Sequence, residues 1–485
     1  MAVLKDENSY KSILKGTSIF GGVQVFQILL ALIRGKFVAI LLGPAGMGVA
    51  ALYTTAANTL QQFASLGLNL AVVKEVAANR DERQKISTVF AVARRLIVMS
   101  ALLGACVCLL FSPLLSRWTF GDDAHTFGFM LLAVMVFFAI SSAGEMSLLQ
   151  GMHEVKRLSK ASIVGGLTGL FVGVPLYYFF GTGGIVPAMI VLSLSTFLFY
   201  SRSVKKSIEV DKVKFVWSSH KPLVMKLIGL GLVLMAGSLI GTFTNYLINL
   251  FVRSFGSLDD VGLYQAANSI TNQYVGVVFS AMALDFFPRL TAIAGDNEKM
   301  RAVVNRQIEI VSLILTPLVA GLIFTAPVII RLLLTESFMS VMPLMRWFGL
   351  GILLRGLNYP MGYIAFAKDN KRLFFWLEGV FGNALNLAVS CVAYYFFGLV
   401  GLGMSLVACS LTAYVVYYIL NRRLYDYGYD RQTTVSAAYA VTAGVTAFLC
   451  SYITDELAAY VAMGAVFVAT CVVSILRIKK VIIRQ

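Results

Sequence analysis

The chain has 485 residues, of which 58% are hydrophobic and only 13% are charged. Soluble proteins carry about 25% charged residues, so this composition excludes an ordinary soluble enzyme or binding domain. Apolar stretches of about 20 residues recur along the whole chain, and each is long enough to cross a bilayer as a helix. Because these stretches are continuous and do not alternate in polarity, we expect an all-α polytopic membrane protein and no transmembrane β-barrel.

The formal net charge of +16 has a topological explanation. Most of the lysines and arginines lie between apolar stretches, on every second connection, as the positive-inside rule describes for cytoplasmic loops. This distribution places both termini in the cytoplasm, and it gives no reason to expect a nucleic-acid partner.

Taken in order, the hydropathy pattern predicts about fourteen transmembrane helices. The first six are expected at 13–42, 46–76, 86–111, 127–150, 161–180 and 184–201. The next six are expected at 222–252, 261–287, 303–325, 342–367, 373–397 and 399–420, and the last two at 433–453 and 457–476. These spans predict two pseudo-symmetric six-helix lobes and a C-terminal helix pair: an N-terminal lobe at 1–201, a cytoplasmic connection at 202–221, a C-terminal lobe at 222–421, and a terminal pair with a basic tail at 422–485.

A glycine-rich turn follows the first predicted span. It runs from Gly43 to Gly48 and leads into a second apolar stretch that ends in Ala-Ala-Asn at Asn58. A similar order of residues recurs from Phe255 to Asn268, with a spacing that differs by a few positions. This weak repeat favours two related halves.

Charged residues within the first span are candidates for substrate binding. A charge at bilayer depth costs about 2.5–3.5 kcal/mol on insertion scales, so it usually faces a cavity, a partner or the interface. Arg34 and Lys36 are two residues apart and therefore point in different directions on a helix. Gln27 precedes Arg34 by seven residues and shares its face, which favours Arg34 as the cavity residue and Lys36 as an interfacial anchor.

A second polar row lies on the predicted seventh span. Asn245, Asn249 and Arg253 follow one another at four-residue spacing and therefore share one helix face. They are candidates for substrate binding. Arg253 also lies close to the external end of its helix, where it could serve only as an anchor.

Three more charged residues lie in the second half. Arg355 is expected near mid-membrane, and Glu378 about 10 Å from the cytoplasmic turn that precedes it. The two could form a structural ion pair or contact substrate. Asp285 precedes Pro288 near the end of its span, and it could couple transport to an ion or pair with Arg289.

No motif of a soluble enzyme accompanies these residues. The chain has no phosphate-binding GxxxxGK[ST] loop and no GxSxG elbow, and its three histidines lie apart in connections. We therefore expect no catalytic residue, no metal site and no cofactor. Guanidinium groups in a membrane cavity suit an anionic ligand, and arginine matches phosphate oxygens through two hydrogen bonds.

Four segments resemble a known family. The segment RGKFVAILLGPAGMG at 34–48 is similar to the opening of bacterial Wzx-type polysaccharide flippases, within the multidrug/oligosaccharidyl-lipid/polysaccharide exporter superfamily. The segment from Leu334 to Gly379 is similar to the Wzx pattern, with Arg355 as its basic residue and Glu378 as the acidic residue of the next helix. The segments DDVGLYQAANSI at 259–270 and FFPRLTAI at 286–293 fit the same pattern. The resemblance covers most of the chain and is nearest to flippases of O-antigen and enterobacterial common antigen.

The resemblance implies a transporter of the bacterial inner membrane that works by alternating access without hydrolysing ATP. Its substrate would be an undecaprenyl-diphosphate-linked oligosaccharide, turned from the cytoplasmic to the periplasmic leaflet, with proton or sodium coupling as a family-level option. Further expected partners are membrane lipids, the polysaccharide polymerase and the chain-length machinery. Two alternatives stay open: a multidrug/cation antiporter of the same superfamily, which Asp285, Glu378 and Glu145 would suit, and a membrane enzyme that modifies glycans.

Overall fold

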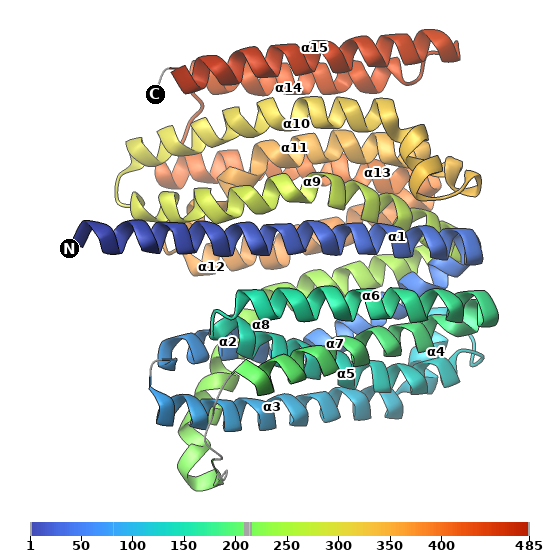
Figure 1. Cartoon of the computed structure of the whole chain (residues 1–485). Helices are drawn as coiled ribbons and strands as arrows, with labels where there is room; N and C mark the ends of the chain where they lie inside the picture. The colour runs from blue at the N-terminus through green and yellow to red at the C-terminus, as the bar shows by residue number, and fades with distance from the viewer. Residues whose placement is uncertain (1, 81, 208–212, 214–215, 484–485) are drawn as a thin grey trace. The chain divides into compact units, whose positions relative to one another are not determined.

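In the computed structural model, the protein is built from helices alone in the part of the chain that is described (Figure 1). That part comprises residues 2–80, 82–207, 213 and 216–483, without the side chains of 2–21, 233, 277, 280–285 and 480–483. The centre of the predicted connection 202–221 lies outside the described residues. The prediction of an all-α membrane protein is confirmed.

The chain forms two compact units, Met1–Ser254 and Phe255–Gln485. The predicted boundary between lobes lies earlier, at 202–221, so the helix predicted at 222–252 belongs to the first compact unit. The grouping of helices into six, six and two stays a prediction.

The first unit consists of eight α-helices and one short 3₁₀-helix among its described residues. They are α1 (Ala2–Ala64), α2 (Leu68–Asn79), α3 (Arg83–Leu110), α4 (Ser112–Phe120), α5 (Thr126–Gly151), α6 (Val155–Phe180), η1 (Gly181–Gly184), α7 (Ile185–Ser207) and α8 (Trp217–Phe255).

Glycines determine how these helices break and pack. Within α1, Gly43 has non-helical angles (φ 67°, ψ −169°), and Pro44 then begins the second half of the helix, a position that suits its fixed φ. The predicted span 46–76 is interrupted at Gly67, whose positive φ of 64° separates α1 from α2. A Cβ atom on Gly67 would lie 2.0 Å from the carbonyl oxygen of Gly231. This close backbone approach holds α8 against the junction of α1 and α2.

Small residues also join α6 to α7. A Cβ atom on Gly165 would lie 3.0 Å from the Cα of Thr196, and one on Gly169 would lie 3.1 Å from the Cα of Leu192. These distances agree with the packing role that the spacing of Gly165 and Gly169 predicts, since small residues let membrane helices approach closely.

The second unit begins at Phe255, and its first helix, α9, is capped by Ser257. Its elements are α9 (Leu258–Ala292), α10 (Asn297–Leu333), η2 (Glu336–Val341), α11 (Met342–Ala367), α12 (Lys371–Phe374), η3 (Phe375–Phe381), α13 (Gly382–Tyr425), α14 (Arg431–Cys450) and α15 (Glu456–Ile483). The element η3 is a π-helix, and α13 contains a break at Gly398 (φ 59°, ψ −143°). The predicted last two spans correspond to α14 and α15, which pack along α10 (Figure 1).

Ten stretches of the described chain are long and apolar enough to cross a membrane. Three of them contain a break, at Gly43, at η1 or at Gly398. The exact count of fourteen spans therefore stays a prediction, whereas the multi-pass character of the chain is clear.

Two hairpins in the two units share the sequence Tyr-Tyr-Phe-Phe-Gly. The first runs from Tyr177 to Gly181, where α6 ends, and the second runs from Tyr394 to Gly398 within α13. Both final glycines have a positive φ, 55° in the first and 59° in the second. In each hairpin the first tyrosine is buried, and the next three side chains are exposed. This repeat is closer than the glycine-rich one predicted from the sequence, and it supports two related halves.

Candidate functional site

A cavity of about 490 Å³ surrounds Arg34 in the first unit. Arg34 comes from α1, and the other walls come from α5, α6 and α7. Among the described lining residues only Arg34 is charged; the others are apolar side chains, hydroxyls, Tyr177, Tyr200 and the amide of Gln27. The cavity therefore offers one guanidinium group to a ligand in otherwise uncharged surroundings.

Gln27 helps to shape this cavity. Its Nε2 atom donates to the carbonyl oxygen of Ser162 at 2.9 Å and contacts the Ser162 hydroxyl oxygen at 2.8 Å, which ties α1 to α6. Gln27 and Arg34 line the same cavity, as their seven-residue spacing predicts. Lys36 is not among the described lining residues of this cavity. The binding roles of these three residues stay predictions.

The polar row on α8 separates into three environments. Asn245 lines a second cavity, which α1, α2 and α5 complete. Asn249 is fully buried and donates from Nδ2 to the carbonyl oxygen of Asn245 at 3.0 Å. Its Oδ1 atom accepts no hydrogen bond from the described residues.

Arg253 lies at the end of the same row, in the last turn of α8. A Cβ atom on Gly121, which caps the C-terminus of α4, would lie 2.9 Å from Nη1 of Arg253. A cation at a helix C-terminus interacts favourably with the carbonyl groups there. This position favours the anchoring role for Arg253, and its role in substrate binding stays a prediction.

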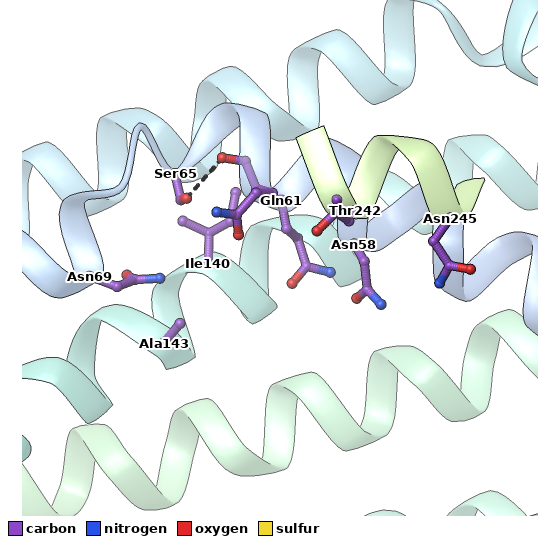
Figure 2. Close-up of a pocket in the computed structure, with 10 residues that line it drawn as sticks. Asn58, Gln61, Ser65, Asn69, Ile140, Ala143, Thr242 and Asn245 are labelled. Atoms are coloured by element: carbon purple, nitrogen blue, oxygen red, sulfur yellow. Dashed lines mark hydrogen bonds between the residues drawn. The ribbon is translucent and has the colours of Figure 1, made fainter. Parts of the chain in front are cut away.

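The second cavity, which we call the amide cavity, has a volume of about 440 Å³ (Figure 2). Apart from Asn245 in the row on α8, the amide residues of this cavity were not predicted from the sequence. The signal was present, because Asn58, Gln61 and Ser65 follow one another at three- and four-residue spacing on an apolar helix, which places them on one face. The described lining residues are Asn58, Gln61, Gln62, Ser65, Asn69, Ile140, Ala143, Gly241, Thr242 and Asn245.

In the second unit, Glu378 lies in the π-helix η3, and its carboxylate accepts a hydrogen bond from the hydroxyl of Tyr417. A Cβ atom on Gly362 would lie 2.6 Å from Oε1 of Glu378, so the glycine makes room for the carboxylate. Single-turn π-helices are frequent at functional sites, because the extra residue changes the direction of side chains. This arrangement makes Glu378 a candidate for an ion-linked step.

Arg355 lies on α11, with its guanidinium carbon 5.9 Å from the centre of the Phe279 ring. Arg355 and Glu378 form no ion pair in the described structure, where no nitrogen–oxygen distance between them is within 4.0 Å. The structural pair that the sequence allowed is therefore absent from the described contacts, and their functional roles stay predictions. The side chain of Asp285 lies outside the described residues.

Two acidic residues of the first unit are paired with basic ones. Oε2 of Glu145 lies 3.0 Å from Nη2 of Arg94, and Oε2 of Glu75 lies 2.7 Å from Nζ of Lys226. Glu145 is a residue that the antiporter alternative would use as a cation ligand. Its pairing with Arg94 reduces the negative charge that it could offer to a cation.

Outside the membrane spans, near the end of α4, the Asp123 carboxyl has a shifted pKa. Arg117 donates to both carboxylate oxygens of Asp123, at 2.7 and 2.9 Å. The hydrogen bonds and positive charge of Arg117 lower the pKa of Asp123. This exposed pair orders the turn between α4 and α5 and lies outside both cavities.

Comparison with known proteins gives the family. The model of a family described as polysaccharide biosynthesis protein matches residues 37–343. The chain belongs to this family. The lipid III flippase of Escherichia coli (strain K12) is 25% identical over 358 residues, which cover 72% of this chain and 83% of that protein. The predicted resemblance to polysaccharide flippases is thereby confirmed.

Solved structures show the same fold at lower identity. The lipid II flippase MurJ, in an inward closed conformation, has a TM-score of 0.72 and 13% identity, over 96% of this chain and 99% of that chain. An inward-facing multidrug resistance transporter of the MATE family has a TM-score of 0.70 and 17% identity, over 82% and 94%. At these identities the likeness supports the fold and does not choose between their substrates.

Proposed function

We propose that the protein flips an undecaprenyl-diphosphate-linked oligosaccharide, such as an O-antigen or related surface polysaccharide repeat unit. The substrate would move from the cytoplasmic to the periplasmic leaflet of the bacterial inner membrane by alternating access, with both protein termini in the cytoplasm. The proposal identifies the protein as a transporter and not an enzyme. Membership of the polysaccharide biosynthesis family and the names of its flippase relatives support it.

The observation that carries the proposal is the guanidinium group of Arg34, which is the one charged group among the described residues that line its cavity. The diphosphate is the part of such a substrate that cannot cross hydrocarbon unaided, because moving a charge into an apolar medium is costly. A guanidinium group can offset that cost through charge-assisted hydrogen bonds to phosphate oxygens. A cation substrate would instead require an acidic cavity, and Glu75 and Glu145 are both paired with basic residues.

The test is to delete the gene, express each variant in the deletion strain, and determine on which face of the membrane the lipid-linked sugar accumulates. Without the protein, single repeat units should accumulate on the cytoplasmic face of the membrane. Arg34→Ala should reduce transport about tenfold or more, because charge-assisted hydrogen bonds contribute about 1.5–3 kcal/mol. Arg34→Lys should retain part of it. Arg331→Ala, which removes an exposed arginine near the end of α10, is the control and should transport normally.

Two outcomes would contradict the proposal. Accumulation of the repeat unit outside the membrane after deletion would place the protein after the flipping step. Transport of a cationic dye that is indifferent to Arg34→Ala would favour the multidrug/cation antiporter.

Ion coupling is part of the same proposal, with Glu378 as its carrier in the second unit. The Glu378 carboxylate accepts a hydrogen bond from the hydroxyl of Tyr417, so a proton or sodium ion bound to that carboxylate would compete with this contact. Glu378→Gln should therefore slow transport driven by an ion gradient and leave substrate binding unchanged. Equal transport by the variant and the original protein in vesicles with an imposed gradient would remove Glu378 from this role.

A further inference from the structure

The amide cavity is lined almost entirely by uncharged groups that form hydrogen bonds (Figure 2). Five of its ten described lining residues are asparagine or glutamine, and Ser65 and Thr242 add two hydroxyls. No charged and no aromatic residue is among them. This lining differs from that of the Arg34 cavity, where most side chains are apolar and one is a cation.

The polar groups come from two helix faces that meet at the cavity. Asn58 and Gln61 lie on one face of α1, and Ser65 lies in the turn directly after this helix. Figure 2 shows Asn58 and Gln61 extending in the same direction. On α8, Thr242 and Asn245 are three residues apart and line the same cavity. The link between the two helices is a hydrogen bond of 2.6 Å from Nε2 of Gln62 to the Ser238 hydroxyl.

Part of this hydrogen-bonding capacity is unused. The side-chain amides of Asn58, Asn69 and Asn245 form no hydrogen bond with any described residue of the chain. Each primary amide carries two N–H donors and a carbonyl acceptor. Polar groups within membrane-spanning segments are costly unless they have partners, and such residues commonly mark a substrate pathway. The unpaired amides therefore point to a ligand that brings its own hydrogen-bonding groups.

The lining also restricts what that ligand can be. The described lining residues offer no charge to select an anion or a cation, and no aromatic ring to stack on a flat apolar compound. Amides and hydroxyls match the hydroxyl and acetamido groups of a neutral sugar, which both donate and accept. The volume of about 440 Å³ lies within the range of about 300–1,000 Å³ that is usual for small-molecule sites.

The two cavities of the first unit adjoin. Ala143 on α5 lines both the Arg34 cavity and the amide cavity. A ligand with a charged part and a neutral polar part could therefore occupy both at once.

We propose that the amide cavity binds the sugar part of the lipid-linked substrate while Arg34 holds the diphosphate. This inference rests on the proposed function and adds that the first unit recognises the neutral sugar through Asn58, Gln61 and Asn245. Recognition through several amides would make the protein sensitive to the hydroxyl pattern of the sugar, because an amide that the sugar does not match loses a hydrogen bond in the complex.

The test measures binding of two lipids to the purified full-length protein in lipid nanodiscs. One lipid is the undecaprenyl-diphosphate-linked oligosaccharide of the source bacterium, and the other is undecaprenyl diphosphate without sugar. The original protein should bind the sugar-bearing lipid more tightly. The double variant Asn58→Ala/Asn245→Ala should bind that lipid about tenfold more weakly, since a neutral hydrogen bond contributes about 0.5–1.5 kcal/mol. Its affinity for the sugar-free lipid should be unchanged.

Two further variants control for effects of removing an amide elsewhere and for misfolding of the double variant. Gln150→Ala removes an exposed amide near the end of α5, away from both cavities, and should bind both lipids as the original protein does. Asn58→Asp preserves the shape of the side chain and replaces its N–H donors with an acceptor. It should weaken binding of the sugar-bearing lipid even if the double variant fails to fold.

The outcomes separate this inference from the proposed function. If the original protein binds both lipids equally, or if the amide variants lose affinity for both lipids equally, the amide cavity does not recognise sugar. If the original protein binds neither lipid, the proposed function itself fails. Two results together support the proposed function and this inference. Arg34→Ala should lose affinity for both lipids, and the amide variants should lose only the preference for the sugar-bearing lipid.

Discussion

The hairpins that begin at Tyr177 and Tyr394 have the same backbone and different chemistry. In both, a second glycine follows seven residues after the first tyrosine, and it packs directly against the preceding helix. A Cβ atom on Gly184 would lie 2.2 Å from the carbonyl oxygen of Leu176, and one on Gly401 would lie 1.9 Å from that of Ala393. The two halves therefore share a turn that only glycine can form.

The buried tyrosines of the two hairpins differ in their surroundings. Tyr177 lines the cavity that contains Arg34. Tyr394 donates from its hydroxyl to Oδ2 of Asp260 at 2.9 Å, and Asp260 also belongs to the capping box at the start of α9. The repeat therefore preserves the backbone geometry, while one unit places a cation near the hairpin and the other places a carboxylate there.

The largest effect is expected at the packed glycines. Gly184→Ala and Gly401→Ala each place a Cβ atom within 2.2 Å of a backbone carbonyl oxygen, and neither helix can relax without moving. Each variant should lose most of its folded protein, as measured by monodisperse yield in size-exclusion chromatography. Gly183→Ala is the matched control, because nothing lies within 4 Å of its Cβ position. A strong loss at only one of the two glycines would show that the hairpins are not equivalent.

A smaller effect is expected at the glycines with positive φ. Gly181→Ala and Gly398→Ala should each destabilise the fold by about 1–3 kcal/mol, because a side chain is strained in that backbone conformation. Nothing lies within 4 Å of either Cβ position, so strain is the only expected cause. Thermal unfolding of the purified variants measures the loss. Unchanged midpoints of thermal unfolding in both variants would contradict the positive φ angles of Gly181 and Gly398.

The tyrosines should respond differently from each other. Tyr394→Phe removes the hydrogen bond to Asp260 and should lower stability by about 1 kcal/mol. Tyr177→Phe removes a hydroxyl that forms no hydrogen bond with the described residues, so stability should change little. If the Arg34 cavity holds substrate, transport should fall in Tyr177→Phe. Reduced transport in Tyr394→Phe, with unchanged transport in Tyr177→Phe, would instead place the ligand near the second hairpin.

The smallest effect is expected at the exposed aromatic residues. Phe179 and Phe396 are 74% and 70% exposed in the structure, and both contact lipid if the hairpins lie at the membrane interface. Phe179→Leu and Phe396→Leu should each change stability by less than about 0.5 kcal/mol. A larger change in thermal unfolding would indicate that another protein surface covers one of these aromatic runs.

Much of the fold could be predicted from the sequence because a bilayer limits what a chain can do. Backbone polar groups in hydrocarbon must be paired within the chain, so long apolar stretches become helices. The residues at which helices break were less predictable. Gly67 lies against the backbone of Gly231, and Glu378 in the π-helix lies against Gly362, and no local sequence pattern encodes those distant partners.

The candidate site, like the fold, could be predicted from the sequence only in part. The spacing of Gln27 and Arg34 on one helix face predicted that they share surroundings, and the structure places both in one cavity. The same reasoning treated Asn245, Asn249 and Arg253 as one face, and the structure gives each a different neighbour. Helical spacing determines direction, but the depth of a cavity along the helix depends on the other helices that surround it.

By itself, the sequence determined the class of protein, its all-helical character and its family, because hydropathy, charge distribution and motifs are properties of the chain in order. Only the tertiary structure decided which polar residues share a cavity. Asn58 and Asn245 are far apart in the sequence and line the same cavity, and α8 packs closely against the end of α1 where Gly231 meets Gly67. Packing between helices that are distant in the sequence is visible only in the folded protein, and so is the amide cavity beside the Arg34 cavity.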